Sequence, residues 1–139
     1  MKKKGLIIVL FFLVAIICAV IIYFWTFRKS ELSVSSKKAD YEIKAAQLIH
    51  DFETDEQVAN EKYLGKILIV DGELKDITED SLSITLSLGS IGDISGILCS
   101  FDKSVIEPGK VQKGQQLKVK GICTGYLLDV VLNKCSIEK

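Results

Sequence analysis

KILIVDGELKDI, residues 66–77, begins the region in which the hydrophobic pattern shifts toward a period of two, and it contains a single glycine, Gly72. A period of two is typical of a β-strand that buries one face. A glycine inside a strand often marks a bulge or a sharp bend, because it allows close backbone approach and backbone shapes that other residues resist. We therefore predict a strand over residues 66–77 that bends near Gly72.

The segments that follow keep the same period. Ser81 to Leu88 places Leu82 and three further aliphatic residues on one face and Ser or Thr on the other, after a polar turn over Thr78 to Asp80. Three more strands are predicted over Ile94 to Phe101, Gln116 to Cys123 and Leu127 to Ile137, the last two joined through Thr124, Gly125 and Tyr126. Five strands on one small core favour a closed barrel, because an open sheet would expose two edges.

Residues 39–64, which precede these strands, are predicted to form an amphipathic helical segment. Apolar residues recur there at helical spacing, at Tyr41, Ala45, Leu48, Ile49 and Phe52. Thr54 and Gln57 have the spacing of a capping box, which predicts a second helical piece from Asp55 to about Tyr63 that stops near Gly65.

The amino-terminal stretch Gly5 to Phe27 contains no residue that is charged at neutral pH. As a helix it would span roughly 34 Å, enough for a hydrocarbon core of about 30 Å. We therefore predict a transmembrane helix over residues 5–27, a cytoplasmic tail over residues 1–4 and a flexible Ser- and Lys-rich linker over residues 28–38. The soluble domain then occupies residues 39–139, with the barrel over residues 65–139.

Two alternatives to a signal-anchor helix are weaker. A cleaved signal peptide has a shorter apolar region, and this one ends in Tyr23, Phe24 and Trp25, which are typical of a membrane interface. A lipid anchor on Cys18 would require a small residue before it, and Ile17 stands there. The flanking charges nearly balance, but the lysines packed before the helix favour an internal amino terminus. The domain is thus expected outside the cytoplasm of a single-pass membrane protein.

The net charge of zero hides an asymmetry between the two parts of the chain. From Ala39 onward, eleven Lys stand against seventeen Asp and Glu, so the domain is about six charges negative. Binding to a phosphate backbone depends on Lys and Arg that displace counterions, so this balance disfavours nucleic acid. A local basic cluster, Lys110, Lys113, Lys118 and Lys120, is predicted to be a solvated face that balances nearby acids.

The residues also carry a resemblance to a known family. The segments AAQLIHDFETDEQVANEKYLGK, ILIVDGEL, CSF and KGQQLKVKGICTGYLLDVVLNKC together resemble the tRNA_anti-like family of bacterial OB-fold proteins over about Ala45 to Ile137. The matching positions are Ala59, Tyr63, Gly65, Lys66, Val70, Gly72, Gly114, Gly121, Cys123, Gly125, Asp129 and Cys135, with Tyr63, Gly65, Gly72, Gly121 and Gly125 taken as the structural motif.

The resemblance implies an OB-fold barrel preceded by a helix, in small proteins that are often exported or tethered to a membrane. The family name records a likeness of fold to anticodon-binding domains rather than an activity. Because the connection between the third and fourth strands is short, we expect the amino-terminal helix to take the place of the helix that usually plugs an OB barrel.

Three cysteines, Cys99, Cys123 and Cys135, fall in the soluble domain and allow three pairings. The resemblance implies a Cys123–Cys135 disulfide, since the family motif has Cys at both positions and the enclosed loop is short. Two observations keep other readings open: a hairpin centred near Gly125 would set Cys123 opposite about Leu128, and buried reduced thiols are also common. No metal site is predicted, because the chain has no C-x-x-C pair and a single His, His50.

No catalytic constellation is predicted. His50 has no evident Ser or Cys partner, and the adjacent acids Glu79 and Asp80 fall in a polar turn with nothing apolar to raise a pKa. We expect a membrane-anchored, extracytoplasmic OB-fold module without cofactors that binds a protein or small ligand through the second and third strands and the Gly89 to Asp93 loop. The alternative is an OB domain that binds single-stranded nucleic acid or oligosaccharide; a third reading is a structural role in an envelope assembly.

Overall fold

The computed structural model describes residues 13–23, 34–90 and 92–138. The chain divides into two units, residues 1–32 and 33–139. In the first, residues 13–23 form a helix with exposed apolar side chains. None of the helices within the described ranges is both long and apolar enough to span a bilayer. The predicted span over residues 5–27 lies only partly within those ranges and the predicted tail over residues 1–4 lies outside them, so both stay predictions.

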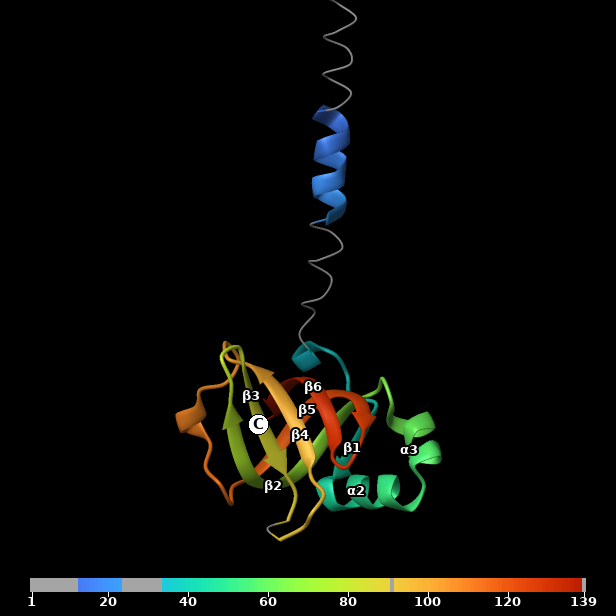
Figure 1. The fold of residues 1–139 in the computed structure, drawn as a ribbon, viewed down its shortest axis with the longest axis vertical. Coiled ribbons are helices and arrows are strands. Elements are labelled where there is room, and N and C mark those ends of the chain that lie inside the picture. Colours follow the sequence, from blue (N-terminus) through green and yellow to red (C-terminus); the bar gives the residue numbers. More distant parts are fainter. Residues whose placement is uncertain (1–12, 24–33, 91, 139) are drawn as a thin grey trace, which may run out of the picture. The chain divides into compact units, whose positions relative to one another are not determined.

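The second unit is built on a closed barrel of five strands (Figure 1). Hydrogen bonds connect the strands in the order β2–β3–β4–β6–β5 and return from β5 to β2; all pairs are antiparallel except β4 with β6. The barrel predicted from the alternating pattern is therefore confirmed. The strands are β2 (Ile67–Glu79), β3 (Ser83–Leu88), β4 (Ile97–Asp102), β5 (Gln116–Tyr126) and β6 (Val130–Glu138).

A short strand, β1 (Tyr41–Lys44), pairs in parallel with β2 from Tyr41↔Leu68 to Lys44↔Asp71. The helix predicted from residue 39 is wrong over this stretch. The reason is tertiary: β3 pairs with β2 only from Leu74 onward, so the edge of the first half of β2 is open and β1 satisfies its backbone groups.

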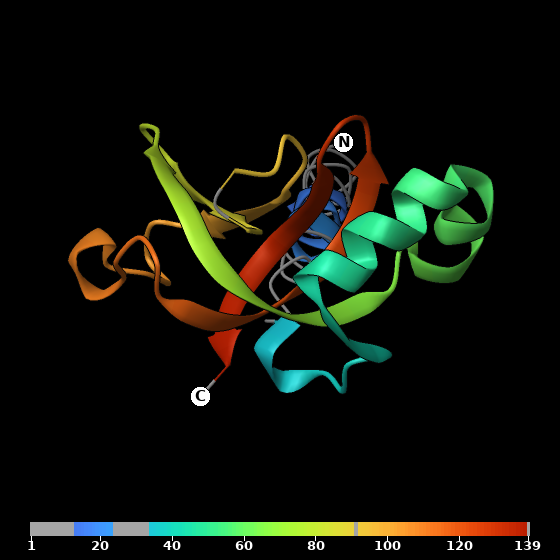
Figure 2. The same ribbon diagram turned by 90° about the horizontal axis from the view of Figure 1, so that it is seen from below.

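Two helices follow, α2 (Ala45–Thr54) and α3 (Glu56–Tyr63), and Figures 1 and 2 show α2 against the barrel with α3 beside it. Leu48, Ile49 and Phe52 of α2 join the barrel core. Residues 103–115, between β4 and β5, contain only the short 3-10 helix η3 (Pro108–Lys110). Packing of α2 into the core fits the expectation that an amino-terminal helix replaces the usual plug.

The start of α3 differs from its prediction. The side chain of Asp55, rather than Thr54, caps the helix by accepting a hydrogen bond from the Val58 N–H at 3.1 Å. At the other end Gly65 takes a positive φ of 75°, and its N–H donates to the Cys123 carbonyl at 2.8 Å. A glycine there lets the chain leave the helix and enter the barrel.

Several predicted strand ends are wrong at turns. Leu82 was expected on the buried face of its strand and Ile94 at the start of the next strand, but these residues are 83% and 87% exposed because β3 and β4 begin later. The β5–β6 turn lies at residues 127–129 rather than at 124–126, since register shifts along β5 lengthen that strand. The buried face of β4, with Cys99 and Phe101, is as predicted.

The predicted flexible linker ends earlier than Lys38. Val34–Ser36 form a 3-10 helix, η2, that contacts β5 and β6, and the Val34 side chain is only 3% exposed. Lys120, 6% exposed, donates from Nζ to the Ser35 carbonyl at 3.1 Å and pairs with Glu138 at 3.4 Å. Residues 34–36 are therefore part of the barrel domain.

Gly72 lies where β2 changes partners. Glu73 is the last β2 residue paired with β5, and Leu74 is the first paired with β3. A Cβ at Gly72 would lie 2.7 Å from the Ala45 Cβ and 3.3 Å from the Leu88 Cβ. Only a residue without a side chain allows α2 to begin this close to the strand.

We expect Gly72→Ala to lower the free energy of unfolding by about 1–3 kcal/mol, because the added methyl group forces the start of α2 away from β2. Urea unfolding followed by circular dichroism measures this change. Gly125→Ala is the matched control, since a Cβ there would meet nothing within 4 Å. An equal loss in both variants would contradict the packing argument.

Candidate interaction surface

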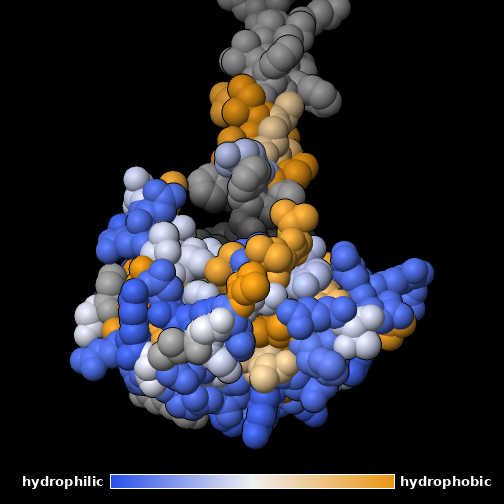
Figure 3. Space-filling view, turned by 60° about the horizontal axis from the view of Figure 1, so that its bottom comes forward, coloured by the Kyte–Doolittle hydropathy of each residue, from blue (hydrophilic) through white to orange (hydrophobic). Residues whose placement is uncertain are grey.

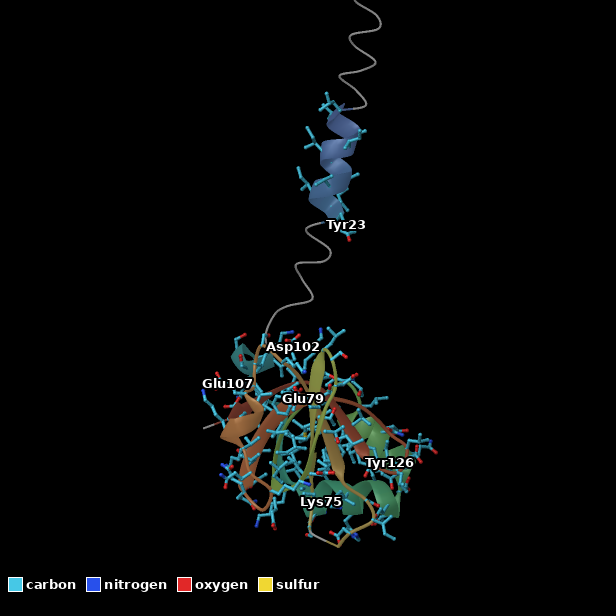
Figure 4. All side chains as sticks on the ribbon, turned by 60° about the vertical axis from the view of Figure 1, so that its left-hand side comes forward. Tyr23, Lys75, Glu79, Asp102, Glu107 and Tyr126 are labelled. Atoms are coloured by element: carbon cyan, nitrogen blue, oxygen red, sulfur yellow. The ribbon has the colours of Figure 1, made fainter. Side chains whose placement is uncertain are left out.

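A row of aromatic rings joins the helices to the barrel. Tyr41 meets Tyr63 edge-on with centroids 5.5 Å apart, Phe52 lies 6.0 Å from Tyr63, and Phe52 stacks on Tyr126 at 5.0 Å. Offset and edge-on pairs of this kind stabilise beyond the area they bury. The row fixes α2 against the end of β5, where Tyr126 is labelled in Figure 4.

Asp51 connects the two helices. It accepts hydrogen bonds from the Tyr63 hydroxyl at 2.6 Å and from Gln47 Nε2 at 2.7 Å, and its carboxylate lies 3.6 Å from Lys62 Nζ. The Tyr63 hydrogen bond is the main reason why the pKa of Asp51 is lowered, and burial opposes it. Burial chiefly raises the pKa of Tyr63. These hydrogen bonds to the charged Asp51 carboxylate hold α2 and α3 together.

A cleft of about 550 Å³ lies between α2 and the loop that joins β3 to β4. Two hydrogen bonds hold its rim: Ser95 Oγ donates to Glu53 at 2.8 Å, and Lys75 Nζ donates to the Asp93 carbonyl at 2.6 Å. The cleft includes part of the predicted Gly89 to Asp93 contact loop. Its lining is apolar at Ala46, Ile49 and Ile94 and polar at His50, Glu53, Asp93 and Ser95.

Exposed apolar side chains are also found on the β5–β6 turn. Leu127 is 92% exposed, and Leu128 and Ile94 are also exposed. The turn and the loop are tied together, because the Asp129 carboxylate accepts from the Gly96 N–H at 2.6 Å. Sequence reasoning missed this pair of leucines, although two adjacent apolar residues in a turn were a usable signal.

Three carboxylates lie close enough to Tyr126 to affect the pKa of its hydroxyl. Burial first, and then the charges of Glu53, Glu56 and Asp129, raise the pKa of Tyr126. On the face shown in Figure 3, apolar residues gather among hydrophilic ones. We use the name hairpin-loop surface for six residues of the β5–β6 hairpin, the β3–β4 loop and the two helices: Ile94, Tyr126, Leu127, Leu128, Glu53 and Glu56.

The predicted basic cluster is neutralised by ion pairs. Lys110 pairs with Glu107 at 3.0 Å, Lys113 with Asp76 at 2.5 Å, Lys118 with Glu42 at 2.6 Å and Lys120 with Glu138 at 3.4 Å. Surface pairs add little to stability, but they leave less positive charge for a phosphate ligand. This agrees with the expectation that these lysines balance nearby acids.

Cys99, Cys123 and Cys135 are buried free thiols in this structure, so the implied Cys123–Cys135 bond is not formed here. The β5–β6 register sets Cys123 opposite Leu132, not opposite Leu128 as predicted. The Cys135 thiol is instead a neighbour of Cys99: burial raises the pKa of Cys99 well above its usual value, and Cys135 adds to the effect.

The other motif and candidate positions have structural partners. Gly121 gives room for the Cys135 sulfur, which would lie 2.7 Å from an added Cβ. Glu79 pairs with Lys103 at 2.7 Å, and Asp80 accepts from the Ser81 N–H, so these acids do not face each other across a site. Within the described ranges no group of three or more His, Cys, Asp or Glu could hold a metal ion.

The strand order, the closed barrel and the helix packed into its core define a small OB-fold module. The chain belongs to the tRNA_anti-like family, whose model matches residues 1–137. This confirms the family expected from the sequence. No curated protein matches the chain.

A solved structure shares the fold. A protein of Klebsiella pneumoniae subsp. pneumoniae MGH 78578, described as a "putative nucleic acid-binding lipoprotein", is 16% identical, with a TM-score of 0.59 over 78% of this chain and 98% of that one. Asparaginyl-tRNA synthetase of Entamoeba histolytica is 15% identical, with a TM-score of 0.41 over 52% of this chain and 20% of its own length.

Tyr63→Phe is expected to destabilise the domain at neutral pH by about 1 kcal/mol, because it removes a hydrogen bond to the ionised Asp51. A carboxylate whose pKa is lowered on folding stabilises above its unfolded pKa, near 3.8, and loses that contribution as pH falls through the folded value. The difference in the free energy of unfolding between wild type and Tyr63→Phe should therefore become smaller below about pH 4. Urea unfolding between pH 7 and pH 3 tests this, with Tyr41→Phe as the control on an exposed ring; a gap that does not change with pH would contradict it.

Proposed function

We propose that this chain is a membrane-anchored OB-fold module that holds its barrel outside the cytoplasm and binds a protein partner there. The observation that carries the proposal is the hairpin-loop surface, where Leu127, Leu128 and Ile94 are exposed on a turn and a loop that the hydrogen bond between Asp129 and Gly96 joins. Adjoining exposed apolar side chains rimmed by polar residues are typical of protein interaction sites. A phosphate ligand is less favoured, because the lysines that could bind it are paired with acids.

The anchoring part of the proposal rests on the sequence. The run from Gly5 to Phe27 is uncharged and three lysines precede it. The Klebsiella protein that shares the fold is itself described as a lipoprotein, which is a second way of fixing an OB domain to a membrane.

Binding of single-stranded nucleic acid is the second candidate. The description of the Klebsiella protein favours it, and so does Tyr126, a partly exposed ring near a barrel turn on which a base could stack. Against it, Glu53, Glu56 and Asp129 bring negative charge to that ring. Oligosaccharide is a further ligand class that OB folds accept.

A photo-reactive residue at position 128 of the full chain, expressed in its own cells, should crosslink to one recurring protein. The same residue at position 82, which is exposed on the β2–β3 turn, is the control and should give no such adduct. Mass spectrometry of the adducts identifies the partner. Absence of a position-128 adduct would overturn the proposal, and so would binding of single-stranded DNA by the full chain that weakens steeply between low and high salt.

Topology is tested by labelling a Lys38→Cys variant of the full chain in intact cells with a thiol reagent that does not cross membranes. We expect labelling at this exposed position, because the domain is proposed to lie outside and Cys99, Cys123 and Cys135 are buried. Lys4→Cys is the matched control and should react only after permeabilisation. The reverse pattern would place the domain in the cytoplasm.

A further inference from the structure

The hairpin-loop surface combines an apolar centre with a negative surround. Residues 45–63, which form α2 and α3, contain five carboxylates and one lysine, Lys62, and that lysine faces Asp51. Glu53 follows Phe52, whose ring stacks on Tyr126 at 5.0 Å, so α2 brings this carboxylate beside the β5–β6 hairpin; Glu53 and Glu56 also contribute to the raised pKa of Tyr126. Glu53 receives a hydrogen bond from Ser95 and is paired with no cation among the described residues.

The negative charge around this surface favours some classes of ligand over others. Nucleic acid and anionic lipid headgroups would meet the carboxylates of Glu53 and Glu56 with like charge, which costs affinity and slows association. A purely polar polycation would leave Leu127 and Leu128 in water. A polypeptide segment that carries both apolar and basic side chains satisfies both conditions.

We infer that the partner docks on the hairpin-loop surface through a segment in which Lys or Arg alternates with apolar residues. This inference rests on the proposed function and names the chemistry of its partner. One apolar side chain of the segment packs on Leu127 and Leu128, and the next enters the cleft beside Ile49 and Ile94. The cleft, at about 550 Å³, is within the size range of small ligand sites and accommodates a side chain with its backbone.

The rim carboxylates then face the basic side chains of the segment. Because Glu53 and Glu56 are exposed, their attraction to Lys or Arg mainly sets the rate of association and the sensitivity to salt. The leucines, which lose their contact with water on docking, supply most of the affinity. Substitutions of the glutamates and of the leucines should therefore have different effects on binding.

The test measures binding of a short labelled peptide of alternating lysine and leucine to the full chain in nanodiscs of neutral lipid, with empty nanodiscs subtracted. We expect saturable binding that weakens at least about tenfold in the double variant Leu127→Ser, Leu128→Ser. The double variant Glu53→Gln, Glu56→Gln should weaken binding by about three- to tenfold and flatten its salt dependence. Leu82→Ser and Glu107→Gln are the matched controls, exposed residues away from this surface, and should leave binding unchanged.

The unfolding midpoint of each variant shows whether it keeps its fold, and single Leu127→Ser replaces the double variant if that one does not. Equal binding of a peptide with glutamate in place of lysine would overturn the inference, as would equal loss in Leu82→Ser. If the position-128 crosslink recurs but the lysine-leucine peptide does not bind, the proposed function stands and this inference falls. If the crosslink is absent as well, the proposed function falls first.

Discussion

The pairing of β2 with three other strands is the constraint on which the rest of the domain depends. Its first half lies between β1 and β5, and its second half pairs with β3. The change of partner happens at Gly72, where α2 begins close to the strand. The absence of a side chain at Gly72 lets α2 begin against the strand and pack into the barrel core, and the aromatic row connects α2 to Tyr126. The hairpin-loop surface is positioned by this chain of contacts.

Charge is distributed unevenly between the barrel wall and the helices. On the barrel wall, four lysines of the β4–β5 connection and of β5 are ion-paired. Their acidic partners are Glu107, just before η3, and one residue each of β1, β2 and β6, so each of these lysine charges is balanced by an acid. Around α2 and α3, acids outnumber lysines, and apolar side chains of two turns are exposed beside them. An OB fold is often associated with nucleic acid, whereas acidic residues predominate at the helical end of this domain.

The parts of the fold that follow from local pattern were predictable from the sequence. Alternation identified the five barrel strands, helical spacing of apolar residues identified α2, and the spacing of a capping box identified α3. Strand β1 was not predictable, because four residues have no decisive local signal and it forms only to pair with an open edge of β2. Turn positions near Leu82 and Leu127 were wrong because register shifts within long strands depend on the partner strand. The surface was missed for the same reason: its leucines were assigned to strands, and only the true turns expose them.

Closure of the barrel also has a consequence for how the domain folds. The last contacts of the ring join Ile67 to Ile122 and Glu73 to Gln116, residues more than forty positions apart in the chain. Such distant pairings are slow to form, because the entropy of a long loop is lost before the new contacts stabilise the chain. During synthesis, the β2–β3 hairpin is complete well before β5 emerges, and its unpaired edge stays available to other chains until then. We expect this interval, rather than the finished barrel, to be the stage at which the protein is most exposed to aggregation and proteolysis.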